Sequence, residues 1–146
     1  TELGVSKIVP LFTERVVPKS FSANKIERWQ RIAVEACKQS GRVKVPAISE
    51  PVSFDLFVKD AEPSSLKLIP WEGEKELCLK KILPDTLKNR KVTFIVGPEG
   101  GLTNSEIVIA KEYGFIPVSL GRRILRTETV PLVLLSIVQH IYGDLA

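Results

Sequence analysis

The sequence of 146 residues contains no methionine, only two cysteines and a single histidine. Cys37 and Cys78 lie far apart and belong to no CxxC pair, and His140 is the one imidazole that could join them. This set indicates neither a disulfide framework nor a zinc site. We therefore expect a reduced, cytoplasmic protein that holds no metal.

Long apolar runs are missing as well. The longest nearly apolar stretch, residues 130–138, is far shorter than the roughly 20 residues that a membrane-spanning helix needs. The first residues do not have the pattern of a signal peptide. Because the chain starts at Thr1, and residues 2–5 resemble the end of a helix with Gly4 at its C-cap position, we expect an excised domain or a processed fragment.

Composition favours one packed domain. A chain of this length buries roughly two-thirds of its unfolded surface, and 44% of the residues are hydrophobic. The net charge of +4 and the isoelectric point near 9.1 favour an anionic partner such as RNA. This basic excess is mild and establishes no function by itself.

Residues 92–102 organise the rest of the chain. Residues 92–96 have the β-branched and aromatic content of a buried strand, and the Gly-Pro-Glu-Gly-Gly run at 97–101 ends it. Thr103 and Glu106 then have the spacing of a capping box, which predicts the start of a helix. In an α/β sheet such a loop lies at the carboxyl end of its strand, where ligands usually bind.

A second stretch, residues 119–129, repeats this arrangement. It follows a predicted strand at 115–120 and leads into a predicted helix at 130–142. Each loop alone could be a plain turn, and the first has neither the lysine of a phosphate loop nor the spacing of a dinucleotide fingerprint. Together, the two loops can face one another across a single crevice.

The remaining chain alternates strands and helices. We predict strands at 7–12, with Pro10 at an edge or a bulge, and at 66–70, and helices at 24–40, from 53, at 76–83 and at 103–113. This pattern predicts an α/β fold with a largely parallel sheet flanked by helices. Trp29 lies on the apolar stripe of its helix and is expected in the core. The last helix is apolar nearly all round, so it either crosses the core or forms a dimer interface.

Gly97-Pro98-Glu99-Gly100-Gly101-Leu102 and the run from Leu120 to Thr129 together resemble the paired cofactor motifs of the small-subunit ribosomal RNA N3-uridine methyltransferases. Residues 2–5 and 38–42 agree, so the resemblance covers essentially the whole chain, 1–146. This family belongs to the SPOUT, or trefoil-knot, superfamily. The resemblance implies a carboxyl-terminal trefoil knot, a homodimer and an additional amino-terminal PUA-like β-barrel domain for RNA, which this chain does not contain.

The resemblance further implies transfer of a methyl group from S-adenosylmethionine to N3 of a uridine in 16S ribosomal RNA. The cofactor-binding residues would be Ile69, Pro70, Gly97, Gly101, Leu120, Gly121, Ile124 and Leu125. The Arg126 guanidinium could stabilise the developing oxyanion while the Glu128 carboxylate accepts the N3 proton. Alternatively, these two residues only brace the cofactor loop and cap the next helix. Trp71 could cover an adenine or pack locally.

Five basic residues are candidate RNA ligands: Arg15, Lys19, Arg42, Arg122 and Arg123. Basic side chains beside the site could hold phosphates, although Arg15 and Lys19 also suit an ordinary solvated loop. Two positions depart from the family pattern. Lys38 stands where an acidic residue is more usual, and Pro131 stands where the family often has a small residue. The proline is tolerable in a first helical turn.

Two other functions stay open. A non-catalytic RNA-binding module of the small ribosomal subunit would bind RNA without binding the cofactor. A nucleotide-dependent enzyme could use residues 97–101 as a phosphate loop, although the missing lysine counts against it.

Overall fold

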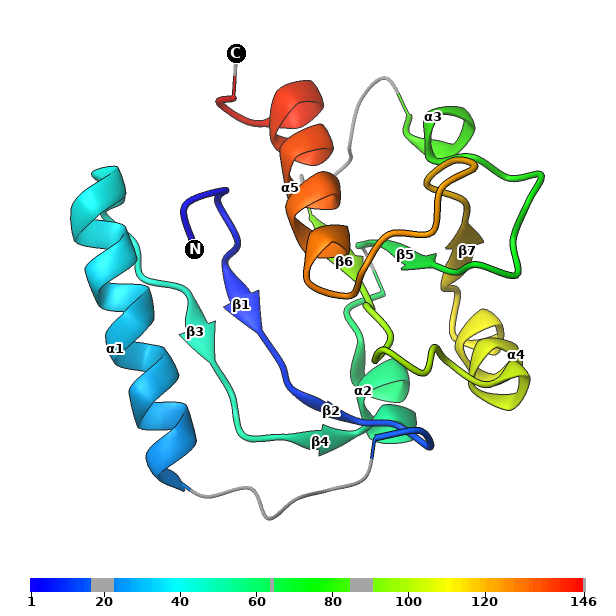
Figure 1. Cartoon of the computed structure of the whole chain (residues 1–146), viewed down its shortest axis with the longest axis horizontal. Helices are drawn as coiled ribbons and strands as arrows, with labels where there is room; N and C mark the ends of the chain where they lie inside the picture. Colours follow the sequence, from blue (N-terminus) through cyan, green and yellow to red (C-terminus); the bar gives the residue numbers. More distant parts are fainter. Residues whose placement is uncertain (17–22, 64, 85–90, 146) are drawn as a thin grey trace.

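A three-stranded parallel sheet forms the centre of the computed structural model, which describes residues 1–16, 23–63, 65–84 and 91–145 (Figure 1). The middle strand is β5 (Leu66–Pro70), with β6 (Val92–Phe94) on one side and β7 (Ile116–Val118) on the other. Leu68 pairs with Phe94 and with Ile116, and both ladders are parallel. The predicted α/β fold with a largely parallel sheet is confirmed.

Two smaller parallel pairs build the amino-terminal part. β1 (Lys7–Ile8) pairs with β3 (Ala47–Ile48), and β2 (Leu11–Phe12) pairs with β4 (Val52–Ser53). The prediction of one continuous strand at 7–12 is wrong, because the segment is interrupted at Pro10 and forms two short strands, β1 and β2. Proline has no N–H to give to a ladder, but the Pro10 carbonyl still accepts the Val52 amide at 3.1 Å.

In the described ranges, four helices connect successive strands and a fifth follows β7. They are α1 (Ala23–Ser40), α2 (Phe54–Asp60), α3 (Leu79–Ile82), α4 (Asn104–Glu112) and α5 (Thr129–Tyr142). α1 lies at the outer edge of the molecule beside β3 (Figure 1). Pro131 falls in the first turn of α5, where its missing N–H has no helical partner to lose.

The alternation of side chains along β5 creates a separate core on each face of the sheet. Leu68 and Ile69 are neighbours with 0% exposure, and they point to opposite faces. Ile69 belongs to the cluster formed with α2 and α4 through Phe54, Val58, Ile107 and Ala110. Leu68 belongs to the cluster formed with β7, α3 and α5 through Val118, Leu79 and Leu134.

Several sequence predictions need correction. The helix predicted at 76–83 is only the single turn α3, because Cys78 is extended and bridges to Ser119. Residues 2–5 form a turn closed by the Gly4 amide on the Thr1 carbonyl, at 3.1 Å. On the expected apolar face of α1, Trp29 is only half-buried and Ile32 is 55% exposed.

α5 is less buried than its sequence predicts. Leu134 is its one fully buried side chain, whereas Leu132 and Ile141 are 56% and 47% exposed. The trefoil knot stays a prediction. Within the part of the chain that the structure describes, no helix is both long and apolar enough to cross a membrane.

Candidate functional site

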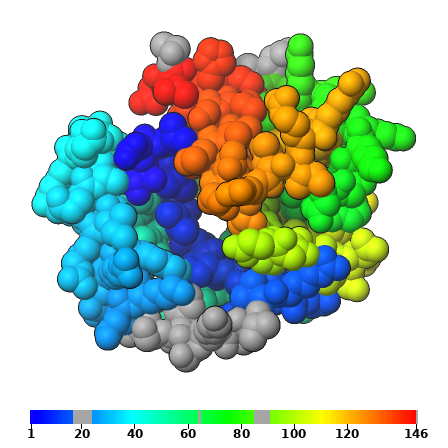
Figure 2. Space-filling model, viewed as in Figure 1, coloured from blue at the N-terminus to red at the C-terminus, as the bar shows by residue number. Residues whose placement is uncertain are grey.

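The two loops predicted to face each other border one cavity of about 630 Å³. In Figure 2 the yellow-green loop after β6 and the orange loop before α5 lie next to each other on the visible face. The end of β5 completes the rim. The lining residues are Pro70, Trp71, Glu72, Val96, Gly97, Pro98, Glu99, Gly101, Leu102, Ile124, Leu125, Arg126, Thr127, Glu128 and Val130.

Glycines shape the first loop. The Gly101 amide closes a turn on the Pro98 carbonyl at 2.8 Å, and Gly101 has a φ of +71°. A Cβ added at Gly101 would lie 2.6 Å from Oε1 of Glu72, and one at Gly97 would lie 3.2 Å from Cγ of Leu102. A side chain at Gly97 would be tightly packed, and one at Gly101 would be strained because of its positive φ, so glycine at both positions leaves backbone open to the cavity.

The predicted capping box that follows this loop is confirmed. Thr103 Oγ1 accepts the Glu106 amide at 3.2 Å, and Oε2 of Glu106 accepts the Thr103 amide at 2.8 Å. The other carboxylate oxygen, Oε1, accepts the Glu14 amide at 2.9 Å. Glu106 thus fixes the start of α4 and also ties the chain after β2 to it.

The second loop presents the polar side chains. Arg126 and Glu128 are exposed and line the cavity, and the Arg126 carbonyl accepts the Thr129 and Val130 amides at the start of α5. Glu128 occupies the N-cap position of α5, but its side chain makes no cap hydrogen bond. Among the described residues, Arg126 and Glu128 form no ion pair with each other.

Seven of the predicted cofactor and catalytic residues line this cavity together: Pro70, Gly97, Gly101, Ile124, Leu125, Arg126 and Glu128. Three predicted residues do not. Ile69 is buried in the core, and Leu120 packs against the second core cluster. Gly121 is exposed with a φ of +115°, and its amide donates to Ser119 Oγ at 3.3 Å. The cofactor contacts expected of Ile69, Leu120 and Gly121 stay predictions.

The predicted RNA ligands are dispersed. Arg122 and Arg123 are exposed on the second loop, while Arg15 donates from Nη1 to the Gly100 carbonyl at 2.5 Å. Arg42 lies elsewhere, at a second cavity of about 510 Å³, and donates to the Thr1 carbonyl at 2.5 Å. Lys19 lies outside the described residues.

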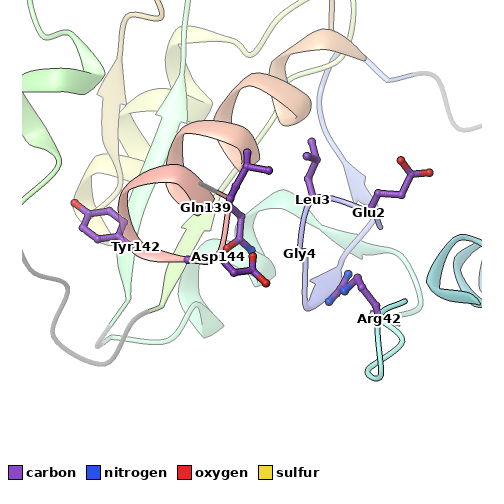
Figure 3. A pocket seen from close by; sticks show the side chains of 9 residues that line it. Glu2, Leu3, Gly4, Arg42, Gln139, Tyr142 and Asp144 are labelled. Atoms are coloured by element: carbon purple, nitrogen blue, oxygen red, sulfur yellow. The ribbon is translucent and has the colours of Figure 1, made fainter. Parts of the chain in front are cut away.

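Figure 3 shows this second cavity. Gln139 and Asp144 at the end of α5 lie on one side, and Leu3, Gly4 and Arg42 lie on the other. A Cβ at Gly4, which has a φ of +82°, would lie only 1.8 Å from Nε2 of Gln139. Gly4 therefore lets the amino-terminal turn pack against α5.

Sequence reasoning did not select two carboxylates of the main cavity, Glu72 and Glu99. Glu72 follows the end of β5 and Glu99 lies inside the glycine loop, so the rule that ligands bind at strand ends could have found both. Trp71 packs against the core cluster and over Gly73, as one of its two expected environments requires. It also lines the cavity, and its contact with an adenine stays a prediction. No group of three or more potential metal ligands comes together in the described part of the chain.

Residues 1–139 match the sequence pattern of a family described as an RNA methyltransferase domain. The chain belongs to this family. Its relatives include proteins named ribosomal RNA small subunit methyltransferase E. The Synechocystis protein is 44% identical over 137 residues, which is 93% of this chain and 45% of the relative. The Bacillus subtilis protein is 33% identical over 147 residues, which is 96% of this chain and 57% of the relative.

Solved structures agree with this assignment. The ribosomal RNA small subunit methyltransferase E from Neisseria gonorrhoeae, bound to S-adenosyl methionine, is 37% identical with a TM-score of 0.88; the match covers 99% of this chain and 59% of that one. A structure from Legionella pneumophila in complex with bound cofactor SAM is also 37% identical with a TM-score of 0.84, covering 95% and 57%. This RNA methyltransferase domain thus spans about half the length of the proteins that it matches.

Proposed function

We propose that this chain is the catalytic domain of an S-adenosylmethionine-dependent methyltransferase that methylates N3 of a uridine in 16S ribosomal RNA. The observation that carries the proposal is the single cavity lined by both motif loops. The structural neighbour from Neisseria gonorrhoeae, at 37% identity, was crystallised with S-adenosyl methionine. The proposal includes a homodimer in the cytoplasm.

The residues of the cavity suit this cofactor. Its volume of about 630 Å³ falls within the roughly 300–1,000 Å³ typical of small-molecule sites. The side-chain-free positions at Gly97 and Gly101 allow backbone groups to hold a flat polar ring. Ile124 lines the cavity although it is 86% exposed, so an apolar ligand surface would remove it from water.

Two chemical tasks are assigned to residues of this chain: removing the N3 proton of the base and stabilising the negative charge that develops on it. When bound, the cofactor supplies the methyl group. Uridine N3 carries a proton at neutral pH, so we assign Glu128 to accept that proton and Arg126 to donate to the base oxygen on which negative charge develops. The backbone of this segment also braces α5, because the Arg126 carbonyl accepts the Thr129 and Val130 amides, but the Glu128 side chain makes no cap hydrogen bond. The target base must leave its stack to enter the cavity.

The first test is calorimetric titration with S-adenosylmethionine and S-adenosylhomocysteine. We expect micromolar binding by the wild-type chain and none by Gly101→Val, because valine is strained at a φ of +71° and its side chain would also displace the Glu72 carboxylate. A folded wild-type chain that binds RNA but neither compound would contradict the proposal and favour the RNA-binding module. Competition by adenosine nucleotides would instead favour a nucleotide-dependent enzyme.

The second test measures methylation of small-subunit ribosomal RNA. We expect Arg126→Ala and Glu128→Gln each to lower the rate by about 100-fold or more with unchanged cofactor affinity. Glu112→Gln, an exposed carboxylate at the end of α4, is the control and should keep full activity. Full activity in both site variants would refute their assigned roles.

A further inference from the structure

Residues 13–16, which follow β2, lie against the glycine loop and the start of α4. Arg15 donates from Nη1 to the Gly100 carbonyl, and the Glu14 amide donates to Oε1 of Glu106. These bonds span 85 and 92 positions of sequence. In Figure 2 the blue amino-terminal segment lies directly against the yellow-green loop. Arg15 therefore contacts one end of the stretch from Gly100 to Thr103 directly. Glu14 is linked to the other end through the Glu106 carboxylate, which also accepts the Thr103 amide.

Glu106 is the buried half of this contact. It is only 2% exposed, and its two carboxylate oxygens accept the amides of Glu14 and Thr103 at 2.9 and 2.8 Å. A buried carboxylate is costly unless it is hydrogen-bonded. Because one carboxylate satisfies both amides, separating residues 13–16 from α4 would leave part of that group unpaired.

Gly101 is enclosed between two charged side chains. A Cβ added at Gly101 would lie 2.6 Å from Oε1 of Glu72 and 3.6 Å from Nη1 of Arg15. The loop is thus limited by the end of β5 on one side and by residues 13–16 on the other. Its shape depends on side chains that come from outside the loop.

We infer that Arg15 is a positioning residue for the cofactor loop. Its guanidinium fixes the Gly100 carbonyl and, together with Glu106, keeps residues 97–101 in the conformation that the cofactor meets. The inference rests on the proposed function. Without Arg15 the loop must be ordered at the moment of binding, and that ordering reduces affinity. This role differs from a contact between Arg15 and an RNA phosphate, because it acts in the absence of RNA.

The test compares Arg15→Ala, Arg15→Lys and Arg31→Ala. Arg31 is an exposed arginine of α1 and serves as the matched control. We expect Arg15→Ala to raise the Kd for S-adenosylmethionine by roughly three- to tenfold, Arg15→Lys to restore part of the affinity, and Arg31→Ala to leave it unchanged. Because Arg15 is exposed, the melting temperature should stay constant. Glu106→Gln should shift the Kd in the same direction.

Hydrogen exchange of the Gly101 amide gives a second readout that needs no cofactor. This amide donates to the Pro98 carbonyl, so a loosened loop should exchange it faster in Arg15→Ala than in Arg31→Ala. Unchanged exchange, or unchanged cofactor affinity together with weaker RNA binding, overturns the inference and returns Arg15 to the phosphate role. A wild-type chain that fails to bind S-adenosylmethionine overturns the proposed function, which is a separate result.

Discussion

Gly100 and Gly101 are neighbours in the cofactor loop, but a side chain would meet different surroundings at each. At Gly101, with a φ of +71°, a Cβ would lie 2.6 Å from Oε1 of Glu72, whereas at Gly100 it would lie 3.5 Å from the Arg15 side chain, an ordinary contact. We expect Gly101→Ala to weaken cofactor binding about tenfold or more and to destabilise the chain by about 1 kcal/mol. Calorimetry and thermal unfolding measure the two effects.

Gly100→Ala is the control for that prediction and should leave the Kd nearly unchanged. If alanine changed the Kd equally at the two positions, the positive φ of Gly101 would not be the cause of the weaker binding. That result would contradict the prediction.

Glu74 is a residue whose charge should influence stability at low pH. Its Oε1 accepts the Leu77 and Glu76 amides, each at 2.9 Å, and these bonds lower the pKa of the carboxyl below its ordinary value of 4.5. A lowered folded pKa stabilises the chain above the unfolded value, and this stabilisation is lost as pH falls through the folded pKa. We expect Glu74→Gln to be less stable than wild type at pH 7 and equally stable in strong acid.

Urea unfolding as a function of pH tests the Glu74 prediction. Glu76→Gln is a suitable control, because Glu76 is exposed and takes part in this turn through its backbone amide. A difference between wild type and Glu74→Gln that stays constant from neutral to acidic pH would contradict the assigned cause.

Among the elements, α4 has the cap that is most closely connected to the site. Thr103→Ala removes the hydroxyl that accepts the Glu106 amide, and we expect it to cost about 1 kcal/mol of stability. It should also weaken cofactor binding, since Thr103, the N-cap of α4, lies two residues after Gly101. Ser53→Ala removes the corresponding cap of α2, whose hydroxyl accepts the Leu56 amide at 3.3 Å. That variant should lose stability but keep its affinity for the cofactor. Unfolding and calorimetric titration of both variants would show the difference.

Elements with a strong local pattern could be predicted from the sequence. The β-branched run of β6, the capping box of α4 and the placement of the glycine loop at a strand end all depend on neighbours within a few residues. Elements decided by distant contacts could not. Cys78 is extended because it bridges to Ser119, which shortened the predicted helix to α3.

The same distinction applies to the site. Pro70, Gly97, Arg126 and their motif neighbours line one cavity because the motifs themselves form its walls. Ile69 directly precedes Pro70 near the end of β5. Because side chains alternate along the strand, the Ile69 side chain points into the core. The hydrogen bond between the Glu14 amide and the Glu106 carboxylate joins positions 92 residues apart, so no local sequence pattern predicts it.

At the scale of the whole molecule, α5 carries apolar side chains that the described part of the chain leaves exposed. Leu132 remains 56% exposed and Ile141 remains 47% exposed. Nine positions separate these two residues, so they lie on opposite sides of the helix and do not form one face; we expect the proposed homodimer to bury the side that carries Leu132. If the proposed homodimer forms, we expect Leu132→Glu to convert it to a monomer, because the interface would then have to bury a charge without a partner. Sedimentation equilibrium measures the change.

Val108→Glu is the matched control for Leu132→Glu. Val108 lies on α4 and is also 56% exposed, so it offers an equal change of charge and apolar area on a helix outside the proposed interface. Dissociation by Leu132→Glu but not by Val108→Glu would assign the dimer to α5. Because Val130 in the first turn of α5 and Thr127 just before the helix line the cavity, the monomeric variant should also bind the cofactor more weakly. A wild-type chain that sediments as a monomer at every concentration would contradict the proposed dimer.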